Sequence, residues 1–215
     1  MRRADPRTVR TFRTRPALGG RGWGGRERTP ERSPSMAPRR IQLRQWREAD
    51  LEPYAAMNGD PEVMRHYPRT LDREESRASM ERNRAGIDER GWGLWAVDVD
   101  GAFAGYTGLA VPGFTAPFTP CTEIGWRLRR EFWGLGVAYT AALQAERFAF
   151  ETLRLTELVS FTTVANTRSR RLMERLGFSR DLNGDFLHPL LDRDSPLRPH
   201  VLYRKANAWE VQRTT

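Results

Sequence analysis

Two glycines two residues apart, Gly134 and Gly136, precede a segment whose apolar spacing predicts a helix. Glycine lets the main chain approach a ligand closely and adopt positive φ angles. A helix that begins at such a turn offers unpaired N–H groups and the positive end of its dipole, which together suit an anion such as a pyrophosphate. A plain strand-to-helix turn is the alternative interpretation. The turn is not a Walker loop, because no Gly-Lys-Ser/Thr follows, and Tyr139 interrupts the Gly-x-Gly-x-x-Gly dinucleotide pattern.

A carboxylate, Glu123, stands at the start of the preceding segment, residues 123–128, which is predicted to form a strand. Because side chains alternate along a strand, Glu123 is expected to share a face with Gly125 and Arg127. A carboxylate in this place could accept the proton of an amine, directly or through water. The alternatives are a salt-bridged surface glutamate and one that only binds a substrate ammonium.

Polar side chains also mark the start of a later helix, which is expected to end at Gly177. Asn166 or Thr167 is predicted to cap this helix, and Ser169 lies in its first turn. Ser169 could protonate or hydrogen-bond a leaving sulfur, or serve only the helix start. Asn166 could contact a cofactor, or only cap the helix.

The segment 112–120 is rich in Pro, Phe and Thr and is predicted to be a long loop. Phe114 and Phe118 in this loop are candidates to wall a pocket for an acceptor substrate, although aromatic residues more often belong to a core. Cys121 is expected to be inert, because the sequence places no evident base beside its thiol.

The elements that must position these residues alternate in a pattern typical of an α/β domain with a mixed sheet. Asp100-Gly101 is a strong signal for a two-residue hairpin, and Asp72 and Glu75 have the spacing of a capping box. A capping aspartate and a proline mark a further helix start at residues 60–62. The predicted order is β-α-α-β-β-β-α-β-α-β, with strands at 41–44, 94–99, 102–111, 123–128, 158–164 and 200–203, and helices that include 48–57, 72–90, 136–152 and 166–176.

Three separated motifs in this order resemble the GNAT superfamily of N-acetyltransferases over roughly residues 40–205. The first is Trp133-x-x-Gly136-x-Ala138, close to the Gln/Arg-x-x-Gly-x-Gly/Ala loop of that family. Its tryptophan departs from the general pattern but resembles the RimJ/RimL-like branch, whose members acetylate protein N-terminal amines. The second is the segment 161–178, with Asn-x-x-Ser before a helix that ends Leu-Gly-Phe, and the third is the segment 188–204.

The resemblance implies a GNAT-like acyl-CoA N-acyltransferase fold, in which helices flank a central mixed, mostly antiparallel sheet. It implies acetyl-CoA as the co-substrate and three sets of contacts with it. Backbone groups of Trp126, Arg127 and Leu128 would pair with the pantetheine arm; the segment Trp133, Gly134, Leu135, Gly136, Val137 and Ala138 would hold the pyrophosphate; and Asn166 and Ser169 would lie by the thioester.

The activity that the resemblance implies is direct transfer of an acetyl group from the thioester to a primary amine, either a protein N-terminal amine or a small-molecule amine. Glu123 is then the candidate base and Ser169 a candidate acid. Many GNAT enzymes place a tyrosine acid where this chain has Met173, which cannot give up a proton. A non-catalytic acyl-CoA-binding regulatory module is therefore the alternative function.

The net charge of +9 is concentrated near the start of the chain. Residues 1–35 hold ten arginines and three acidic residues, a net charge of +7 that leaves only +2 for the other 180 residues. We expect a disordered Arg/Gly/Pro-rich tail at 1–38, an acetyltransferase domain at 39–207 and a short tail at 208–215. Nucleic-acid binding is conceivable only through the basic tail, which could also be sequence upstream of a natural start at Met36.

Several classes of protein are excluded by composition. One cysteine and three scattered histidines provide no metal-ligand spacing, so no metal is expected. No apolar run is long enough for a membrane-spanning helix, and the start lacks the apolar core of a secretory signal. We expect a cytoplasmic protein, monomeric or homodimeric, whose partners are acetyl-CoA and an amine acceptor.

Overall fold

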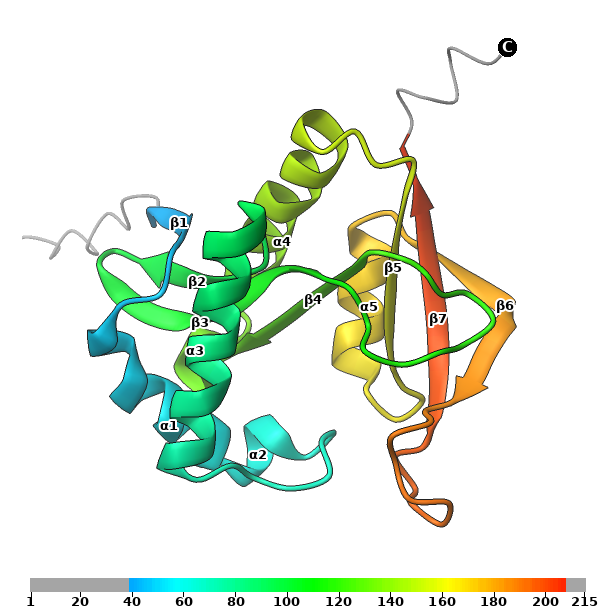
Figure 1. Ribbon diagram of the computed structural model, residues 1–215, viewed down its shortest axis with the longest axis horizontal. Helices are drawn as coiled ribbons and strands as arrows, with labels where there is room; N and C mark the ends of the chain where they lie inside the picture. The colour runs from blue at the N-terminus through cyan, green and yellow to red at the C-terminus, as the bar shows by residue number, and fades with distance from the viewer. Residues whose placement is uncertain (1–38, 208–215) are drawn as a thin grey trace, which may run out of the picture. The chain divides into compact units, whose positions relative to one another are not determined.

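The computed structural model describes residues 39–207, so the tails predicted at 1–38 and 208–215 lie outside the described residues. Seven strands form one sheet in the order β1-β2-β3-β4-β5-β7-β6 (Figure 1). Every neighbouring pair is antiparallel except β4 and β5, which are parallel. The strands are β1 (Ile41–Arg44), β2 (Leu94–Val99), β3 (Ala102–Ala110), β4 (Glu123–Leu128), β5 (Glu157–Thr163), β6 (Ser179–Leu187) and β7 (Pro199–Ala206).

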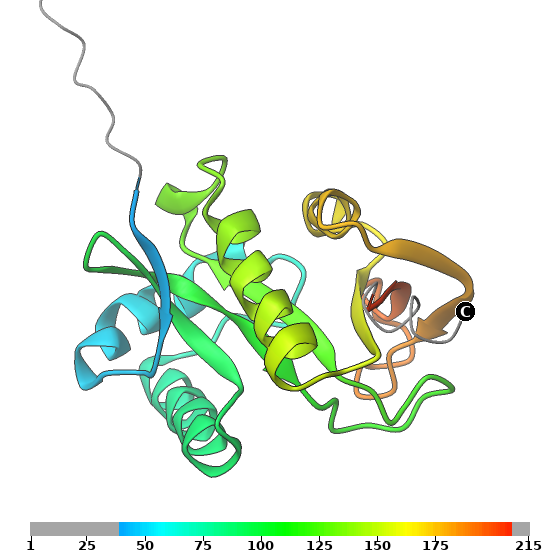
Figure 2. The same ribbon diagram turned by 90° about the horizontal axis from the view of Figure 1, so that it is seen from above.

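Helices cover both faces of this sheet. On one face, α1 and α3 pack against Ala96 and Phe103 of β2 and β3. On the other face, α4 packs against Val97 and Ala104. These residues directly follow Ala96 and Phe103, and their side chains point to the opposite face because side chains alternate along a strand. Seen from above, α3 and α4 lie on opposite sides of the strands between them (Figure 2). The helices are α1 (Leu51–Gly59), α2 (Pro61–Met64), α3 (Arg73–Arg90), α4 (Val137–Arg147) and α5 (Thr167–Arg175).

The predicted helix starts are confirmed in atomic detail. The Asp60 side chain accepts a hydrogen bond from the Glu62 N–H at 2.8 Å, with Pro61 at the first helical position of α2. At α3 the Asp72 carboxylate accepts from the Glu75 N–H, and the Glu75 carboxylate accepts from the Asp72 N–H, which is the reciprocal pattern of a capping box. These side chains satisfy N–H groups that have no acceptor within their own helix.

The predicted hairpin between β2 and β3 is also confirmed. Asp100 and Gly101 both have positive φ angles, 54° and 91°. Two such residues form the turn whose twist matches that of the flanking strands. The Asp98 carboxylate accepts a hydrogen bond from the Gly101 N–H at 2.7 Å and fixes the turn further.

The sequence-based element order differs from the structure in three places. It has two helices between the first two strands where the structure has α1, α2 and α3, although the start of α2 at residues 60–62 was predicted. It omitted β6, an edge strand that is bulged between Asp181 and Phe186 and that, in the described part of the chain, pairs only with β7. Most of its residues are exposed or half-buried, so the apolar alternation that marks a strand is weak there. The predicted helix at 136–152 is α-helical only to Arg147, and a π-helical turn, Phe148–Thr152, completes it.

None of the helices within residues 39–207 is long and apolar enough to cross a membrane. In the same part of the chain, no group of three His, Cys, Asp or Glu side chains is placed to hold a metal ion.

Candidate active site

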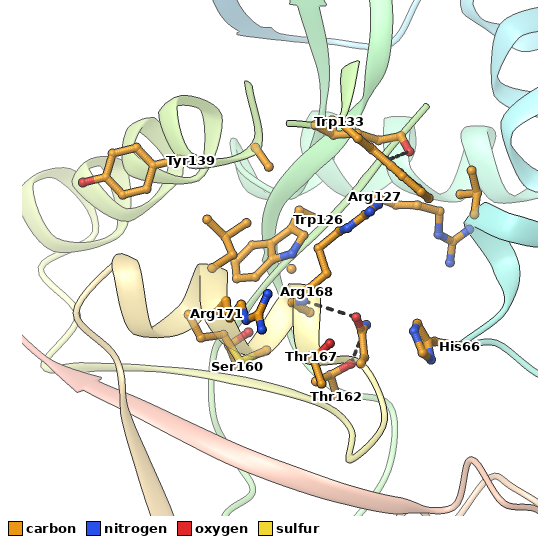
Figure 3. A pocket seen from close by; sticks show the side chains of 18 of the residues that line it. His66, Trp126, Arg127, Trp133, Tyr139, Ser160, Thr162, Thr167, Arg168 and Arg171 are labelled. Atoms are coloured by element: carbon orange, nitrogen blue, oxygen red, sulfur yellow. Dashed lines mark hydrogen bonds between the residues drawn. The ribbon is translucent and has the colours of Figure 1, made fainter. Parts of the chain in front are cut away.

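A cavity of about 640 Å³ lies where β4 and β5 meet. Its walls come from β4, the turn before α4, the C-terminal half of β5, and the first turns of α5 (Figure 3). Residues of α2 and the segment after it complete one end. Most of the residues that the sequence singled out for cofactor binding or catalysis meet around this space: Glu123, Trp126, Arg127, Leu128, Trp133, Gly134, Gly136, Val137, Ala138, Asn166 and Ser169 line it.

The cavity exists because β4 and β5 are paired at only one point. Their register consists of Glu123 opposite Val159, and the Ser160 hydroxyl donates to the Ile124 carbonyl at 2.9 Å just beyond it. Past this contact the two strands diverge (Figure 1). A parallel ladder that stops after one residue leaves the edge of β4 open on that side.

The main chain of Trp126 faces the opening between the strands. Successive residues of a strand direct their main-chain groups to alternate sides. The Ile124 carbonyl points toward β5, whereas the Gly125 carbonyl accepts from the Thr107 hydroxyl of β3 at 2.8 Å. The N–H and C=O of Trp126 therefore point to the β5 side, and an extended ligand could pair with them as an added strand.

Arg127 and Leu128, which were predicted together with Trp126 to contact the pantetheine arm, have less accessible main chains. The Arg127 main chain faces β3, where its carbonyl approaches Gly105 so closely that a Cβ at position 105 would lie 2.2 Å from it. The Leu128 carbonyl points to the open side but accepts a hydrogen bond from the Trp133 indole at 2.8 Å. Of the three residues, Trp126 offers the most accessible main chain to a ligand.

The two glycines of the turn before α4 leave it open. Gly134 and Gly136 have φ angles of 73° and 77°, and a Cβ built on either one would meet no atom within 4 Å. Gly136 is the N-terminal cap of α4 and supplies no side-chain acceptor, so the first N–H groups of the helix are not capped. Leu135, which was predicted with this turn, is 43% exposed and does not line the cavity.

Arginines of α5 add positive charge to the same end of the cavity. Arg168, Arg171 and Arg175 line it, and the Arg168 guanidinium lies 4.1 Å from the centre of the Trp133 ring. An open helix N-terminus beside several arginines is a suitable environment for phosphate groups. Sequence reasoning did not select these arginines, although the basic run 168–171 was a visible signal.

Glu123 lies at the closed end of the opening, on the face of β4 that carries Gly125. Its Oε1 is 3.6 Å from the position that a Cβ on Gly125 would take. Within residues 39–207 its carboxylate makes no hydrogen bond or ion pair, and burial raises its pKa to about 8. A carboxyl group with a pKa near neutrality can exchange a proton with an amine.

Asn166 and Ser169 meet at the start of α5. The Asn166 Oδ1 accepts from the Ser169 N–H at 3.2 Å, and its Nδ2 donates to the Thr162 hydroxyl at 3.0 Å. The amide of Asn166 therefore caps the helix while facing the cavity. Met173 also reaches the cavity wall but is 1% exposed and offers no proton.

The loop aromatics lie outside the cavity. Phe114 and Phe118 each have their ring centre 5.8 Å from that of Phe161, and both also pack against Phe186. In the described residues the cavity is lined by Phe161 and not by Phe114 or Phe118. The two loop residues thus support the wall from behind.

Cys121 also lies off the cavity lining. Burial, with a smaller effect of the nearby Glu123, raises the pKa of its thiol to about 11. A thiol with so high a pKa is almost entirely protonated at neutral pH and is a poor nucleophile.

The fold and this cavity define the class of protein: an α/β domain whose sheet opens beside an uncapped helix N-terminus. The family described as "Acetyltransferase (GNAT) domain" matches residues 40–179, and the chain belongs to this family.

Known proteins similar to the chain agree with this assignment. "FsC-acetyl coenzyme A-N(2)-transacetylase" of Aspergillus fumigatus is 38% identical over 93 residues, which span 41% of this chain and 40% of that protein. An acetyltransferase from Agrobacterium tumefaciens is 28% identical with a TM-score of 0.60, covering 84% of this chain and 99% of that one. Spermidine N-acetyltransferase from Vibrio cholerae, solved with CoA and spermine, shares the fold at 16% identity with a TM-score of 0.61, covering 78% and 96%.

Proposed function

We propose that this protein is an acetyl-CoA-dependent N-acetyltransferase that moves an acetyl group directly to a primary amine. The observation that carries the proposal is the opening between β4 and β5, which has an uncapped helix N-terminus at one end and the unpaired carboxyl group of Glu123 at the other. These features fit the two ends of an acyl-CoA: an anionic diphosphate and a reactive thioester.

The residues that line the cavity have the chemistry to bind CoA. Amides of residues 134–138 would bind the diphosphate, since both glycines leave room for it. The main chain of Trp126 would pair with the pantetheine arm, and Arg168 and Arg171 would meet phosphate oxygens. The bound co-substrate would supply an activated acetyl thioester. The Vibrio enzyme, which has the same fold, was solved with CoA, and this supports the proposal.

Glu123 would act as the base that takes the proton of the attacking amine. An α-amino group has a pKa of about 8 and a lysine amine one of about 10.4. The pKa of Glu123, about 8, is close to the first, so little free energy separates the two protonation states. Met173 has no proton to donate to the departing sulfur, whereas the hydroxyl of Ser169 could donate a hydrogen bond to it. Most of the acceleration would come from positioning the two reactants together.

The acceptor is a primary amine of a protein N-terminus, as the resemblance to the RimJ/RimL-like branch implies, or of a small molecule. The names of the Aspergillus and Vibrio proteins both indicate transfer to nitrogen but point to different acceptors. Because one fold can host many amine substrates, the acceptor must be inferred from the side chains of this cavity.

The test is release of free thiol from acetyl-CoA with a panel of primary amines, run beside calorimetric titration with CoA. The proposal predicts CoA binding and amine-dependent thiol release. Tight CoA binding without thiol release for any amine would instead favour a regulatory acyl-CoA-binding module. Absence of CoA binding would contradict both.

A further inference from the structure

The side chain of Arg127 is a half-buried cation that lines the cavity and that the proposed CoA contacts leave unused. Its Nη1 donates to the Asn58 Oδ1 at 2.8 Å, and its guanidinium lies 3.8 Å from the centre of the Tyr67 ring. Its Nε is buried and finds no hydrogen-bond partner among residues 39–207. Arginine carries five N–H donors, and the one on Nε is left unused here.

No carboxylate neutralises this guanidinium within residues 39–207. Glu62, which lines the same end of the cavity, is paired with Arg65 at 3.0 Å. Glu123 is four residues back along β4, roughly 13 Å away at its Cα by strand geometry. The rings of Tyr67 and Tyr106, 3.8 and 5.4 Å from the guanidinium, offset part of the cost of desolvating this charge. They supply no negative charge, so an anionic ligand would complete the site.

An open strip joins Arg127 to Glu123. Gly125 lies between them on the same face of β4, and a Cβ there would contact nothing within 4 Å except the Glu123 carboxylate. All three residues line the cavity. An acceptor lying along this strip would have one end at the candidate base and the other at an unsatisfied cation.

We propose that the acceptor amine also carries a carboxylate, and that Arg127 binds this carboxylate while Glu123 faces the amine. The inference rests on the proposed function and adds the substrate class. The planar guanidinium fork can bind a carboxylate through two parallel hydrogen bonds. The same charge disfavours polyamines, whose second ammonium would meet this cation.

Arg127 has a purely structural alternative role, because its bond to Asn58 ties β4 to α1. Asn58 is fully buried and also donates to the Ser76 hydroxyl at 3.1 Å. The experiment must therefore measure ligand selectivity, which a structural role does not alter.

The acceptors are glycine, β-alanine, 4-aminobutyrate and 6-aminohexanoate, each compared with its neutral amide. Calorimetry measures the binding of each to the CoA complex, and thiol release measures KM and kcat. For at least one of these four acceptors, wild-type protein should bind the carboxylate about 10- to 100-fold more tightly than the corresponding amide. Arg127→Met should remove this preference while leaving the affinity for CoA unchanged. The control is Arg82→Met, an exposed α3 arginine, which should keep the preference.

Three results would overturn the inference. They are a wild type that prefers no carboxylate over its amide, an equal loss of affinity for carboxylate and amide in Arg127→Met, and a loss of CoA affinity in that variant. Acetylation of amides and carboxylates alike would leave the proposed function intact while removing this inference. If Arg127→Met does not fold, Gly125→Val replaces it. A side chain at 125 should close the strip, so the variant should bind CoA but no acceptor, and binding of both would contradict the proposal.

Discussion

At the scale of single residues, the chemistry depends on the surroundings of Glu123. Burial is the cause of its raised pKa, about 8, because no charged side chain of the described part of the chain contacts the carboxylate. A surface glutamate would be ionised at neutral pH and would hold an amine in its ammonium form. Glu123 can instead lose and regain a proton near the pH at which a cell operates.

The first prediction concerns the pH dependence of transfer. In the wild type, kcat/KM should rise as the pH increases through about 8, as Glu123 and the amine lose their protons. Glu123→Gln should lower turnover at pH 7 by about 100-fold, in the range for loss of a general base, and by less at pH 9.5, where more of the amine is already neutral. Initial rates across this range, with the same amine, provide the measurement. An equal loss at every pH would argue against a base.

The second prediction concerns stability and the same carboxyl group. Its pKa is about 8 in the folded protein and near 4.5 in the unfolded chain, so between these values the folded state binds more protons. Stability contributed by this group is therefore complete below pH 4.5 and falls as the pH rises to about 8. Relative to the wild type, Glu123→Gln should gain on the order of 4 kcal/mol between pH 5 and pH 9. Urea unfolding of both proteins at the two pH values measures this difference, and a constant difference would show that Glu123 has an ordinary pKa.

At the scale of elements, an acidic residue added at the N-terminus of α4 should affect helix stability and CoA binding in opposite directions. An acidic residue in the first turn of a helix stabilises it by about 0.3–1 kcal/mol, because it complements the dipole. The same charge repels a diphosphate. Ala138→Glu, at a residue that lines the cavity, should thus keep or raise the melting temperature while weakening CoA binding about 10-fold or more.

Thr140→Glu is the matched control, since Thr140 is an exposed residue of the same helical turn and does not line the cavity. It should keep the affinity for CoA. Equal affinities in both variants, measured by calorimetry, would show that the diphosphate binds elsewhere.

Local sequence signals predicted most of the elements. The segment 123–128 was expected as a strand and is β4 to the residue, and the caps at Asp72 and Asn166 have local partners three residues away. Such interactions are encoded within a few positions of the chain. β6 was missed because a polar edge strand is defined by its partner β7, which is a tertiary pairing.

The candidate site was predictable to a similar extent. Glu123 and the glycine turn stand out by residue type and spacing, and both line the cavity. The position of Phe114, packed against Phe186 72 residues later, depends on how the loop folds back, which no local pattern encodes. The unsatisfied guanidinium of Arg127 likewise appears only once Asn58 and Tyr67 are placed around it.

At the scale of the whole molecule, one cavity is lined both by the residues proposed to bind CoA and by those proposed to bind the acceptor. The first set includes the glycine turn and the α5 arginines, and the second includes Tyr67 and Arg127. Direct transfer requires both ligands to be bound together, whereas a covalent acetyl-enzyme would form and break down in separate steps. The only thiol in the sequence, Cys121, is protonated and lies off the lining.

Initial rates should therefore give intersecting double-reciprocal lines when both substrates are varied, the pattern of a ternary complex. Cys121→Ala should retain the wild-type kcat. Parallel lines together with an inactive Cys121→Ala variant would indicate an acetyl-cysteine mechanism instead.

The central claim is that the gap between β4 and β5 is a CoA site, and a crystal structure of the protein with CoA tests it most directly. The account predicts that the diphosphate accepts hydrogen bonds from amides of residues 134–138 and that the pantetheine arm pairs with the main chain of Trp126. CoA bound at another surface, or strands that close on each other when CoA is present, would contradict it.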